Sequence, residues 1–478
     1  MKAGFCTVEI TMPIGCEMAG GYSKFFSERI YGPLKIRTAV FAGGGRTTAF
    51  AVVDTSCVDE SFIARVLQMV KNICGAEFDA YIISASHVHT GGFIRDSETD
   101  KLKSCLTPEM FDKLGLKYMP APVPWYYEYC VNQCASALSE AYYRLEEVDI
   151  SVGKGMEAGR IFNRRFRLKN GRECTHPGKL NPEIADFAGP VDPEVNVLGA
   201  WRKDGSLLGC IVNYGCHGTT MCSFKGSHGD WFQYTEAIIK KLLGDDVSTL
   251  IMTGPCGDVT QVNNLSPSCD FGEPVARELG GRVGAEAYKV LLSAVKRSDV
   301  SIDCRSKTIS VAKRRPSAER LKKALDILES SCGMDNDDAM FARHTVVADA
   351  GCRANPESEL NVTAVRIGDA AFVSVQAELF CQLGLDIKAG SKFQNTFIST
   401  LANGYSVYVP TLKAFDPETG GGYETRLTPG RLDIRAGDMI VENSVEMLNS
   451  LSEEKPEEVN FTPAAKVWSY GANRPEIE

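Results

Sequence analysis

Histidine is scarce in this chain, with six residues among 478. Basic residues are also in deficit, because 52 lysines and arginines face 61 acidic residues and the formal charge is −9. A general binder of nucleic acid needs clustered lysine and arginine to displace counterions, so no nucleic-acid partner is expected. No stretch approaches the roughly 20 consecutive apolar residues of a membrane-spanning helix, so no transmembrane segment is expected.

The N-terminal residues, MKAGFCTVEITMPIG, lack the apolar core and the small-residue cleavage site of a secretion signal. We therefore expect a cytoplasmic location. The 17 cysteines are numerous, but they are scattered and contain no Cys-x-x-Cys pair. In a cytoplasmic protein they are expected to be reduced thiols that pack as small hydrophobic side chains.

Strands and helices alternate along the chain, and short turns join several strand pairs. Hairpins are predicted over residues 39–54, 195–215 and 362–378, single strands over 79–86 and 248–253, and helices over 61–74, 125–145, 231–243 and 275–295. Hairpins mixed with crossover helices predict an α/β (mixed α+β) fold. We expect layered mixed or antiparallel sheets covered by helices, and not a doubly wound parallel sheet.

The chain shows no internal repeat, no low-complexity linker and no charge block at a domain joint. We therefore expect residues 1–478 to form a single domain. Residues 314–345 combine a charged helical pattern with the polar link CGMDNDD. This segment is predicted to be a helical insertion that serves as a lid or as a spacer.

Predicted buried strands repeatedly end in a side chain capable of chemistry, and α/β proteins tend to assemble their sites at such ends. ISASHVHTGG carries His87 and His89, SLLGCIVNYGC runs into His217, and AAFVSVQA runs into Glu378. In an extended strand His87 and His89 would point to the same face. Imidazoles from two strands, together with a carboxylate, are a credible zinc shell that keeps one position open for water.

Each of these residues also has an ordinary structural interpretation. Histidines at strand ends are often satisfied core or surface residues, and Tyr405 and Tyr408 in NGYSVYVP can be core aromatics. Asp258 in GDVT can cap the segment that follows a tight turn. The run IFNRRFR is typical of a solvated basic edge, although its Asn163 and Arg164 could orient a carboxylate or a substrate carbonyl.

Taken in their order along the chain, these motifs resemble the catalytic domain of the neutral/alkaline non-lysosomal ceramidases. VEITMPIGCEMAGGY resembles the family's Thr-Pro-x-Gly and Gly-Tyr elements, and ISASHVHTGG its Ser-x-Thr-His-Thr-His-Ser-Gly segment. VDPEVNVLGAW followed by IVNYGCHGTT resembles the strand pair before the second zinc histidine. MTGPCGDVTQ resembles Gly-Asp-Val-Ser-Pro-Asn, VQAELF resembles Pro-Gly-Glu, and NGYSVYVPT with GGYE resembles the late tyrosine motifs.

The resemblance implies a zinc-dependent amidohydrolase that cleaves an N-acyl amide, which in the family is ceramide. It implies one zinc per chain, with His87, His217, Glu378 and Tyr408 as ligands. His89 would lie near the metal, where it would donate to the oxyanion or protonate the leaving amine. The Tyr408 hydroxyl would be a second oxyanion donor.

The remaining site residues are also carried over from the resemblance. Arg164 and Thr260 are predicted to be catalytic, while Asn163, Asp258 and Tyr405 are predicted to bind substrate. The ligand types suit zinc, but availability and geometry decide, so iron, manganese and magnesium stay open.

The sequence departs from the family pattern at several positions. Thr260 stands where the family has serine, Gln261-Val262 replace its Pro-Asn, and Gln376-Ala377 replace its Pro-Gly. Threonine keeps the hydroxyl but adds a methyl group, so a substrate contact can persist in a pocket of changed shape. We expect no leader and no C-terminal β-sandwich domain, and we expect a small-molecule or lipid-like N-acyl amide, of which ceramide is one example.

Two other functions stay compatible with these motifs. The chain could be a ligand-binding descendant that kept the fold and lost turnover, which the changed residue Thr260 favours. It could also be an ester or phosphoester hydrolase built on the same metal site, because a fold does not settle the chemistry. No oligomeric state follows from the motifs.

Overall fold

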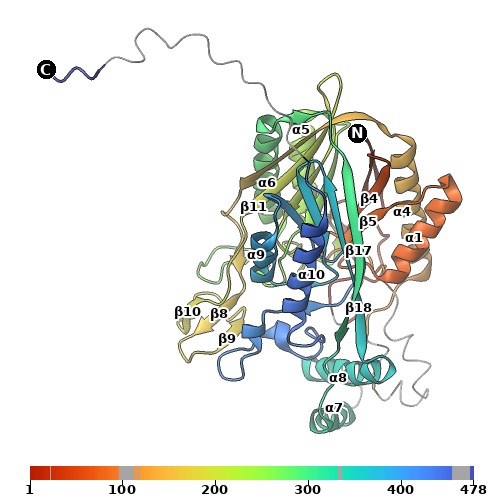
Figure 1. Ribbon diagram of the computed structural model, residues 1–478. Helices are drawn as coiled ribbons and strands as arrows, with labels where there is room; N and C mark the ends of the chain where they lie inside the picture. The colour runs from red at the N-terminus through yellow and green to blue at the C-terminus, as the bar shows by residue number, and fades with distance from the viewer. Residues whose placement is uncertain are drawn as a thin grey trace.

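Two β-sheets pack face to face at the centre of the molecule, and helices lie on their outer sides (Figure 1). The computed structural model describes residues 1–21, 23–95, 112, 114–115, 117, 119–331, 336–454 and 474–478. Tyr22 of the GGY motif lies outside these residues, as does part of the polar link predicted after residue 331.

The larger sheet has nine strands in the described part of the chain. Its order is β14 (Ser248–Thr253), β12 (Leu207–Tyr214), β11 (Glu194–Arg202), β6 (Glu146–Met156), β1 (Lys2–Glu9), β3 (Lys35–Gly43), β4 (Arg46–Val53) and β5 (Ala80–Ala85), with β16 (Lys296–Arg297) paired to β6. The β4–β5 and β12–β14 pairs are parallel, and the other pairs are antiparallel.

The smaller sheet supplies the second inner layer. Its order is β17 (Ile302–Ala312), β18 (Glu357–Ile367), β19 (Ala370–Ser374) and β21 (Asn395–Ser399). Buried side chains of both sheets form one shared core, in which the rings of Phe50 and Phe372 have centroids 5.1 Å apart. Burial of these large apolar side chains on facing sheets is the main force that holds the two layers together.

Helices cover the outer face of each sheet. Those that share a core with the larger sheet are α1 (Glu60–Cys74), α4 (Pro124–Tyr143), α5 (Asp230–Leu243) and α6 (Glu273–Ser293), while α9 (Cys381–Gly390) and α10 (Ala436–Ser450) pack on the smaller sheet. Helices α7 (Ala318–Ser330) and α8 (Asp337–Ala354) pack on each other at one end of the molecule (Figure 1). Among the described helices, none is both long and apolar enough to cross a membrane.

Helix α1 shows how local sequence sets these elements. The side chain of Asp59 accepts the backbone N–H of Phe62 and so caps the first turn. Phe62, Val66 and Val70 recur every four residues and are all buried, which gives the helix one apolar face for the sheet.

Short strands and turns complete the structure around the sheet ends. They are β2 (Arg29–Ile30) with β13 (Gly226–Ser227), β7 (Phe162–Asn163) with β15 (Val259–Thr260), β20 (Glu378–Leu379) with β22 (Tyr408–Val409), the three strands β8 (Arg165–Leu168), β9 (Glu173–Thr175) and β10 (Ile184–Phe187), and the 3-10 turns η2 (Leu412–Phe415) and η3 (Tyr423–Thr425).

The predicted mixed α/β class with layered sheets under helices is confirmed. The predicted insertion contains α7 and the start of α8, although α8 runs past residue 345 to Ala354. Its function as a lid stays a prediction, as does the single-domain organisation. The cysteines that the structure describes are all free thiols, as expected.

The two outermost strands of the larger sheet, β14 and β5, come together through one loop. The backbone N–H of Thr400 donates to the carbonyl of Thr253 at the end of β14, at 2.9 Å. The carbonyl of Leu401 accepts the N–H of Ala85 at the end of β5, at 3.2 Å. The Thr253 hydroxyl also donates to the carbonyl of Ser86 at 2.9 Å. Opposite edges of one sheet therefore meet at the same end of the molecule.

A buried ion network ties the sheet to helix α5 near this end. The Arg37 guanidinium on β3 donates to both carboxylate oxygens of Asp54 and, at 2.8 Å, to Glu236 on α5. Arg37, Asp54 and Glu236 side chains are at most 2% exposed. Burial raises the pKa of the Glu236 carboxyl, but Arg37 and Lys35 outweigh burial and lower it to about 2.

Arg37→Met should lower the free energy of unfolding by about 3–5 kcal/mol, because it leaves two buried carboxylates without their cation. Urea unfolding at pH 7 measures the change. Arg46→Met is the control: Arg46 makes half-exposed pairs, whose loss costs at most about 1 kcal/mol.

The same network predicts that the free energy of unfolding decreases at acidic pH. Because the pKa of Glu236 is depressed, its contribution is complete above the ordinary carboxyl pKa and declines as the pH falls toward about 2. The decline should be smaller in Arg37→Met. Equal unfolding midpoints for wild type and Arg37→Met at pH 7 would show that the network contributes nothing.

Candidate functional site

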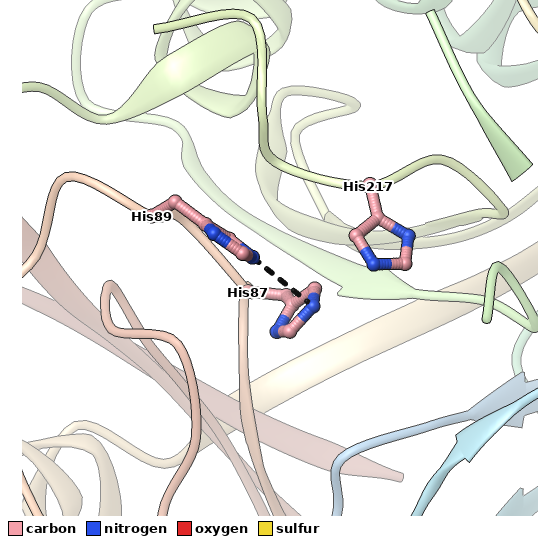
Figure 2. A group of neighbouring side chains, drawn as sticks. All are labelled: His87, His89 and His217. Atoms are coloured by element: carbon pink, nitrogen blue, oxygen red, sulfur yellow. Dashed lines mark hydrogen bonds between the residues drawn. The ribbon is translucent and has the colours of Figure 1, made fainter. Parts of the chain in front are cut away.

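Three histidines that follow two distant strands of the larger sheet meet in one cluster (Figure 2). His87 and His89 follow β5, and His217 follows β12. The ring centroid of His87 lies 4.9 Å from that of His89 and 4.6 Å from that of His217. The predicted meeting of the two strand ends is therefore found in the structure.

The predicted geometry of the His-x-His pair is wrong in one respect. Strand β5 ends at Ala85, and His87 has a left-handed backbone with φ 67°, so the two histidines do not share a face of an extended strand. Their rings meet because the chain turns at His87. Non-glycine residues adopt this backbone region rarely, and histidine is among those that tolerate it.

A close backbone approach joins the two histidine segments. Val88 forms a parallel bridge with Gly218, and the N–H of His89 donates to the carbonyl of Gly218 at 3.1 Å. A Cβ atom on Gly218 would lie 2.7 Å from the carbonyl oxygen of His87, which is closer than packing allows. Glycine is therefore required here so that both chains can present their imidazoles to one point.

Backbone carbonyls fix the protonation of all three rings. The Nδ1 atoms of His87, His89 and His217 lie 2.6, 2.9 and 3.2 Å from the carbonyl oxygens of Ser56, Gly20 and Val259. A carbonyl only accepts, so each Nδ1 carries a hydrogen, and in the neutral tautomer of such a ring the lone pair is on Nε2. These carbonyls orient the rings as the outer partners of metal-bound histidines do.

Burial keeps the rings of His217 and His89 neutral at pH 7. Burial, together with the nearby Arg164 cation, lowers the pKa of His217 to about 4. Burial and the neighbouring imidazoles His87 and His217 hold the pKa of His89 well below its usual value. At pH 7 these two Nε2 atoms are therefore lone-pair donors, the form in which histidine binds a metal.

Glu378 completes the cluster from the smaller sheet's side of the molecule. Its Oε2 lies 3.1 Å from Nε2 of His87 and 3.4 Å from Nε2 of His217. Its Oε1 accepts the Tyr405 hydroxyl at 2.9 Å. In the described part of the chain, no hydrogen-bond donor reaches the buried Oε2.

Tyr408 reaches the same point through strand pairing. Strand β20 pairs in parallel with β22 so that Glu378 lies opposite Tyr408. The Tyr408 hydroxyl is 3.4 Å from Nε2 of His217. The structure thus brings together all four side chains that were predicted as metal ligands, and His89 with them.

A strained loop delivers Tyr405 and supports Glu378. Leu401, Asn403 and Val407 all have positive φ values, of 52°, 60° and 58°. For the β-branched Val407 this backbone is a clear outlier, and its carbonyl accepts the N–H of Glu378 at 2.9 Å. Such strain persists where the surrounding contacts over-determine the conformation, as they do at functional sites.

Arg164 places a positive charge beside the cluster. Its Nη1 is 3.5 Å from Nε2 of His217, and its guanidinium carbon lies 5.3 Å from the ring centroid of Tyr408. Its Nη2 donates to the carbonyl of Gly257 at 2.7 Å. The side chain is buried, so IFNRRFR is not a solvated basic edge.

Glu424 is a site residue that the sequence analysis did not single out. Its fully buried carboxylate accepts Arg164 Nε at 2.8 Å and Arg165 Nη1 at 2.9 Å, together with the Thr175 hydroxyl. It holds Arg164 in place from 260 residues away in sequence. The only sequence signal was its position at the end of the GGYE motif.

Asn163, Asp258 and Thr260 lie in the next layer of contacts. Asp258 accepts Asn163 Nδ2 at 2.7 Å and the N–H of Cys381 at 2.8 Å, so it caps α9 from outside that helix. The Thr260 hydroxyl accepts the N–H of Val262 at 3.1 Å. These contacts hold the loop that carries Arg164, whose N–H donates to the Asp258 carbonyl.

The cluster fits a metal ion on its donor chemistry. One ring nitrogen of each histidine lies within 4.8 Å of those of the other two, and the orphaned carboxylate oxygen of Glu378 lies 3.1 and 3.4 Å from Nε2 of His87 and His217. Lone pairs at such distances repel unless a cation lies between them. One proton can bridge only one such contact, whereas one metal ion can accept several of these lone pairs.

Comparison with known proteins points to one fold. No protein-family profile matches the chain, and no curated protein gives a significant match. The solved structure of neutral ceramidase from Pseudomonas aeruginosa has a TM-score of 0.67 at 18% identity, covering 94% of this chain and 74% of that one. A structure of ceramidase complexed with C2 has a TM-score of 0.65 at 17% identity, with the same coverage. The predicted resemblance is confirmed: the chain has the neutral ceramidase fold.

Glu378→Gln should stabilise the metal-free protein by about 1 kcal/mol, because the amide can donate to a neighbouring Nε2 where the carboxylate cannot. Thermal unfolding in EDTA measures this change. Glu424→Gln is the matched control and should destabilise, because Glu424 neutralises two buried arginines. If both variants lose stability, the Glu378 carboxylate stabilises the metal-free protein, and the argument that it requires a bound cation is wrong.

Proposed function

We propose that this protein is a zinc-dependent hydrolase that cleaves an N-acyl amide. The observation that carries the proposal is the convergence of hydrogen-bond acceptors: Glu378 Oε2 is buried 3.1 and 3.4 Å from Nε2 of His87 and His217 and has no donor among the described residues. A fold shared with ceramidases supports the amide as substrate. Fold alone does not settle chemistry, so the donor set is the stronger argument.

The proposed zinc ligands are His87, His217, Glu378 and Tyr408, with one ion per chain. Neutral imidazole, carboxylate and phenol oxygen suit zinc by ligand type. Zinc held there would polarise the amide carbonyl and supply an acidified water as the nucleophile.

His89 is proposed to move the proton. Its Nδ1–H is engaged by the Gly20 carbonyl and its Nε2 is unprotonated at neutral pH, so Nε2 can accept a proton from the attacking water. The protonated ring can then donate from Nε2 to the leaving amine. The donor role toward the oxyanion, also expected for His89, requires this protonated state.

Arg164 and Tyr408 are proposed to stabilise the negative charge that develops on the amide oxygen. The Arg164 cation is buried beside the cluster, and Glu424 and the Gly257 carbonyl fix its orientation. A donor fixed in advance in a dry site is worth about 3 kcal/mol toward the transition state. Glu424 thereby acts as a positioning residue.

The substrate-contact roles of Asn163, Asp258, Thr260 and Tyr405 are part of the same proposal. Tyr405 already binds Glu378 and lines a neighbouring cavity, so it is well placed for such a contact. The native substrate is proposed to be a small or lipid-like amide, encountered in the cytoplasm as the sequence leads us to expect.

Metal content tests the site directly. We expect about one zinc per chain in wild type, and its loss in His87→Ala and His217→Ala, because each removes a ligand. Elemental analysis after growth with added zinc measures this. His89→Ala should keep the metal and lose turnover. Loss of zinc in His89→Ala, with retention in Glu378→Gln, would replace the proposed ligand set by the three imidazoles.

Thr260→Ser should retain hydrolysis of a given amide within about threefold, because the hydroxyl that the N–H of Val262 binds is preserved and only a methyl group is removed. Steady-state rates on one chromogenic amide compare the two proteins. Thr260→Val keeps the shape and removes the hydroxyl. Full activity in Thr260→Val would exclude a catalytic role for this hydroxyl.

A further inference from the structure

The start of helix α5 contacts both histidine segments. The indole Nε1–H of Trp231 donates to the carbonyl of His217 at 3.2 Å. From the other segment, the hydroxyl of Thr90 donates to the carbonyl of His228 at 2.7 Å. The four residues 228–231 therefore hold the backbone of a proposed zinc ligand and the residue next to the proposed proton carrier, although the two segments follow distant strands of the larger sheet.

The side chain of Asp230 ties this helix start to the loop that follows His217. Its Oδ1 accepts the Thr220 hydroxyl at 2.7 Å, and its Oδ2 accepts the N–H of Met221 at 3.1 Å. Oδ1 also accepts the N–H of Trp231 at 2.8 Å. All three donor residues are buried. One carboxylate thus fixes the loop after His217 and the start of the residue whose indole holds the His217 carbonyl.

These contacts differ from those of an ordinary helix cap. The N-cap residue of α5 is Gly229, whose position has no side-chain capping bond, and Asp230 is the first helical residue. Of the three donors to the Asp230 carboxylate, only the N–H of Trp231 belongs to α5. The other two belong to a turn nine and ten residues earlier in the chain. The carboxylate therefore serves the loop after His217 more than it serves its own helix.

The arrangement at Asp230 costs free energy. Its side chain is fully buried, and among the described residues no cation pairs with it. Burial raises the pKa of the Asp230 carboxyl to about 6, and hydrogen bonds from Thr220, Trp231 and Met221 oppose this shift. Its backbone has φ 48°, in the left-handed region that non-glycine residues rarely adopt. Buried charge and backbone strain of this kind cluster at functional sites.

Helix α5 is itself anchored at other points. Glu236, two turns further along, is held by the buried Arg37 guanidinium. Helix α6 lies so close that a Cβ atom on Gly280 would overlap the carbonyl oxygen of Trp231. The Thr235 hydroxyl donates to the Gly280 carbonyl at 3.0 Å. The start of α5 is therefore a fixed support to which a loop can be bound.

We propose that Asp230 is a positioning residue for the metal centre, which holds the backbone of His217 at the distance from the His87–His89 segment that one ion requires. This inference rests on the proposed zinc hydrolase function. Asp230 acts on His217 through the loop and the indole that it binds. Removal of outer contacts that orient metal ligands typically weakens metal binding by about 10–100-fold.

Zinc affinity tests this role, measured at pH 7 by competition with a chelator. Asp230→Asn keeps the side-chain size, but in either orientation its NH2 group faces a backbone N–H, so the zinc Kd should rise by about 10–100-fold. Thr220→Val is the milder variant and should raise the Kd by about tenfold, the effect of one hydrogen bond. Thr220→Ser keeps the hydroxyl and should restore the Kd to within about twofold of wild type.

The absorption spectrum of the cobalt-loaded protein gives a second readout, because its bands report the arrangement of the ligands around the ion. We expect a changed spectrum in Asp230→Asn and in Thr220→Val, and the wild-type spectrum in Thr220→Ser. A merely structural residue would lower the unfolding temperature and leave this spectrum as it is.

Asp303→Asn is the matched control. Asp303 is also a buried carboxylate, but it accepts the N–H of Ser452 at 2.8 Å and lies on β17 of the smaller sheet. This variant should lower the unfolding temperature of the metal-free protein and keep the zinc Kd and the cobalt spectrum of wild type. Unchanged zinc binding in Asp230→Asn and Thr220→Val, or an equal loss in Asp303→Asn, would overturn the proposal.

Hydrolysis separates this inference from the function on which it rests. If wild type binds zinc and cleaves an N-acyl amide while Asp230→Asn keeps the wild-type Kd, the positioning role is overturned and the hydrolase stays. If wild type binds zinc and cleaves no amide while the Kd rises in Asp230→Asn, the hydrolase is overturned and the positioning role stays. A wild-type protein that binds no zinc would overturn both.

Discussion

The site depends on the close approach of two backbones at Val88 and Gly218. The segments that follow β5 and β12 belong to distant strands of one sheet, and only a glycine allows them to touch. The loop at Thr400 and Leu401 reinforces this approach because it bonds to the ends of both outer strands. Burial of the two facing sheets provides the free energy that holds the sheet ends together.

This backbone arrangement also determines the chemistry. Backbone carbonyls accept hydrogen bonds from Nδ1 of all three imidazoles, and the Tyr405 hydroxyl donates a hydrogen bond to one carboxylate oxygen of Glu378. The remaining acceptor atoms lie close together, and Oε2 of Glu378 has no hydrogen-bond donor among the described residues. A polar cluster of acceptors in a buried site needs a cation, and the Arg164 charge nearby is already engaged by Glu424. The protein thus holds the proposed metal ligands in a fixed arrangement.

The residues around the cluster bear on the choice of substrate, which the shared fold does not decide. The chain shares the ceramidase fold, and a pocket beside the cluster is lined by Tyr405 and Val407 of the strained loop. Helix α8, whose start lies in the predicted insertion, lines part of the same pocket. Function resides in such local features more than in the fold that carries them, because pocket shape and charge decide which substrates enter.

The sequence by itself determined the elements and the kinds of residue at their ends. Periodicity and turn residues predicted the helices and hairpins, and the order of the motifs predicted that His87, His217, Glu378 and Tyr408 would meet. It did not predict the left-handed turn at His87 or the burial of Arg164 against Glu424. Local patterns depend on neighbours a few residues apart, whereas these features depend on contacts between segments up to 260 residues apart, which only the packing of the two sheets and their loops brings together.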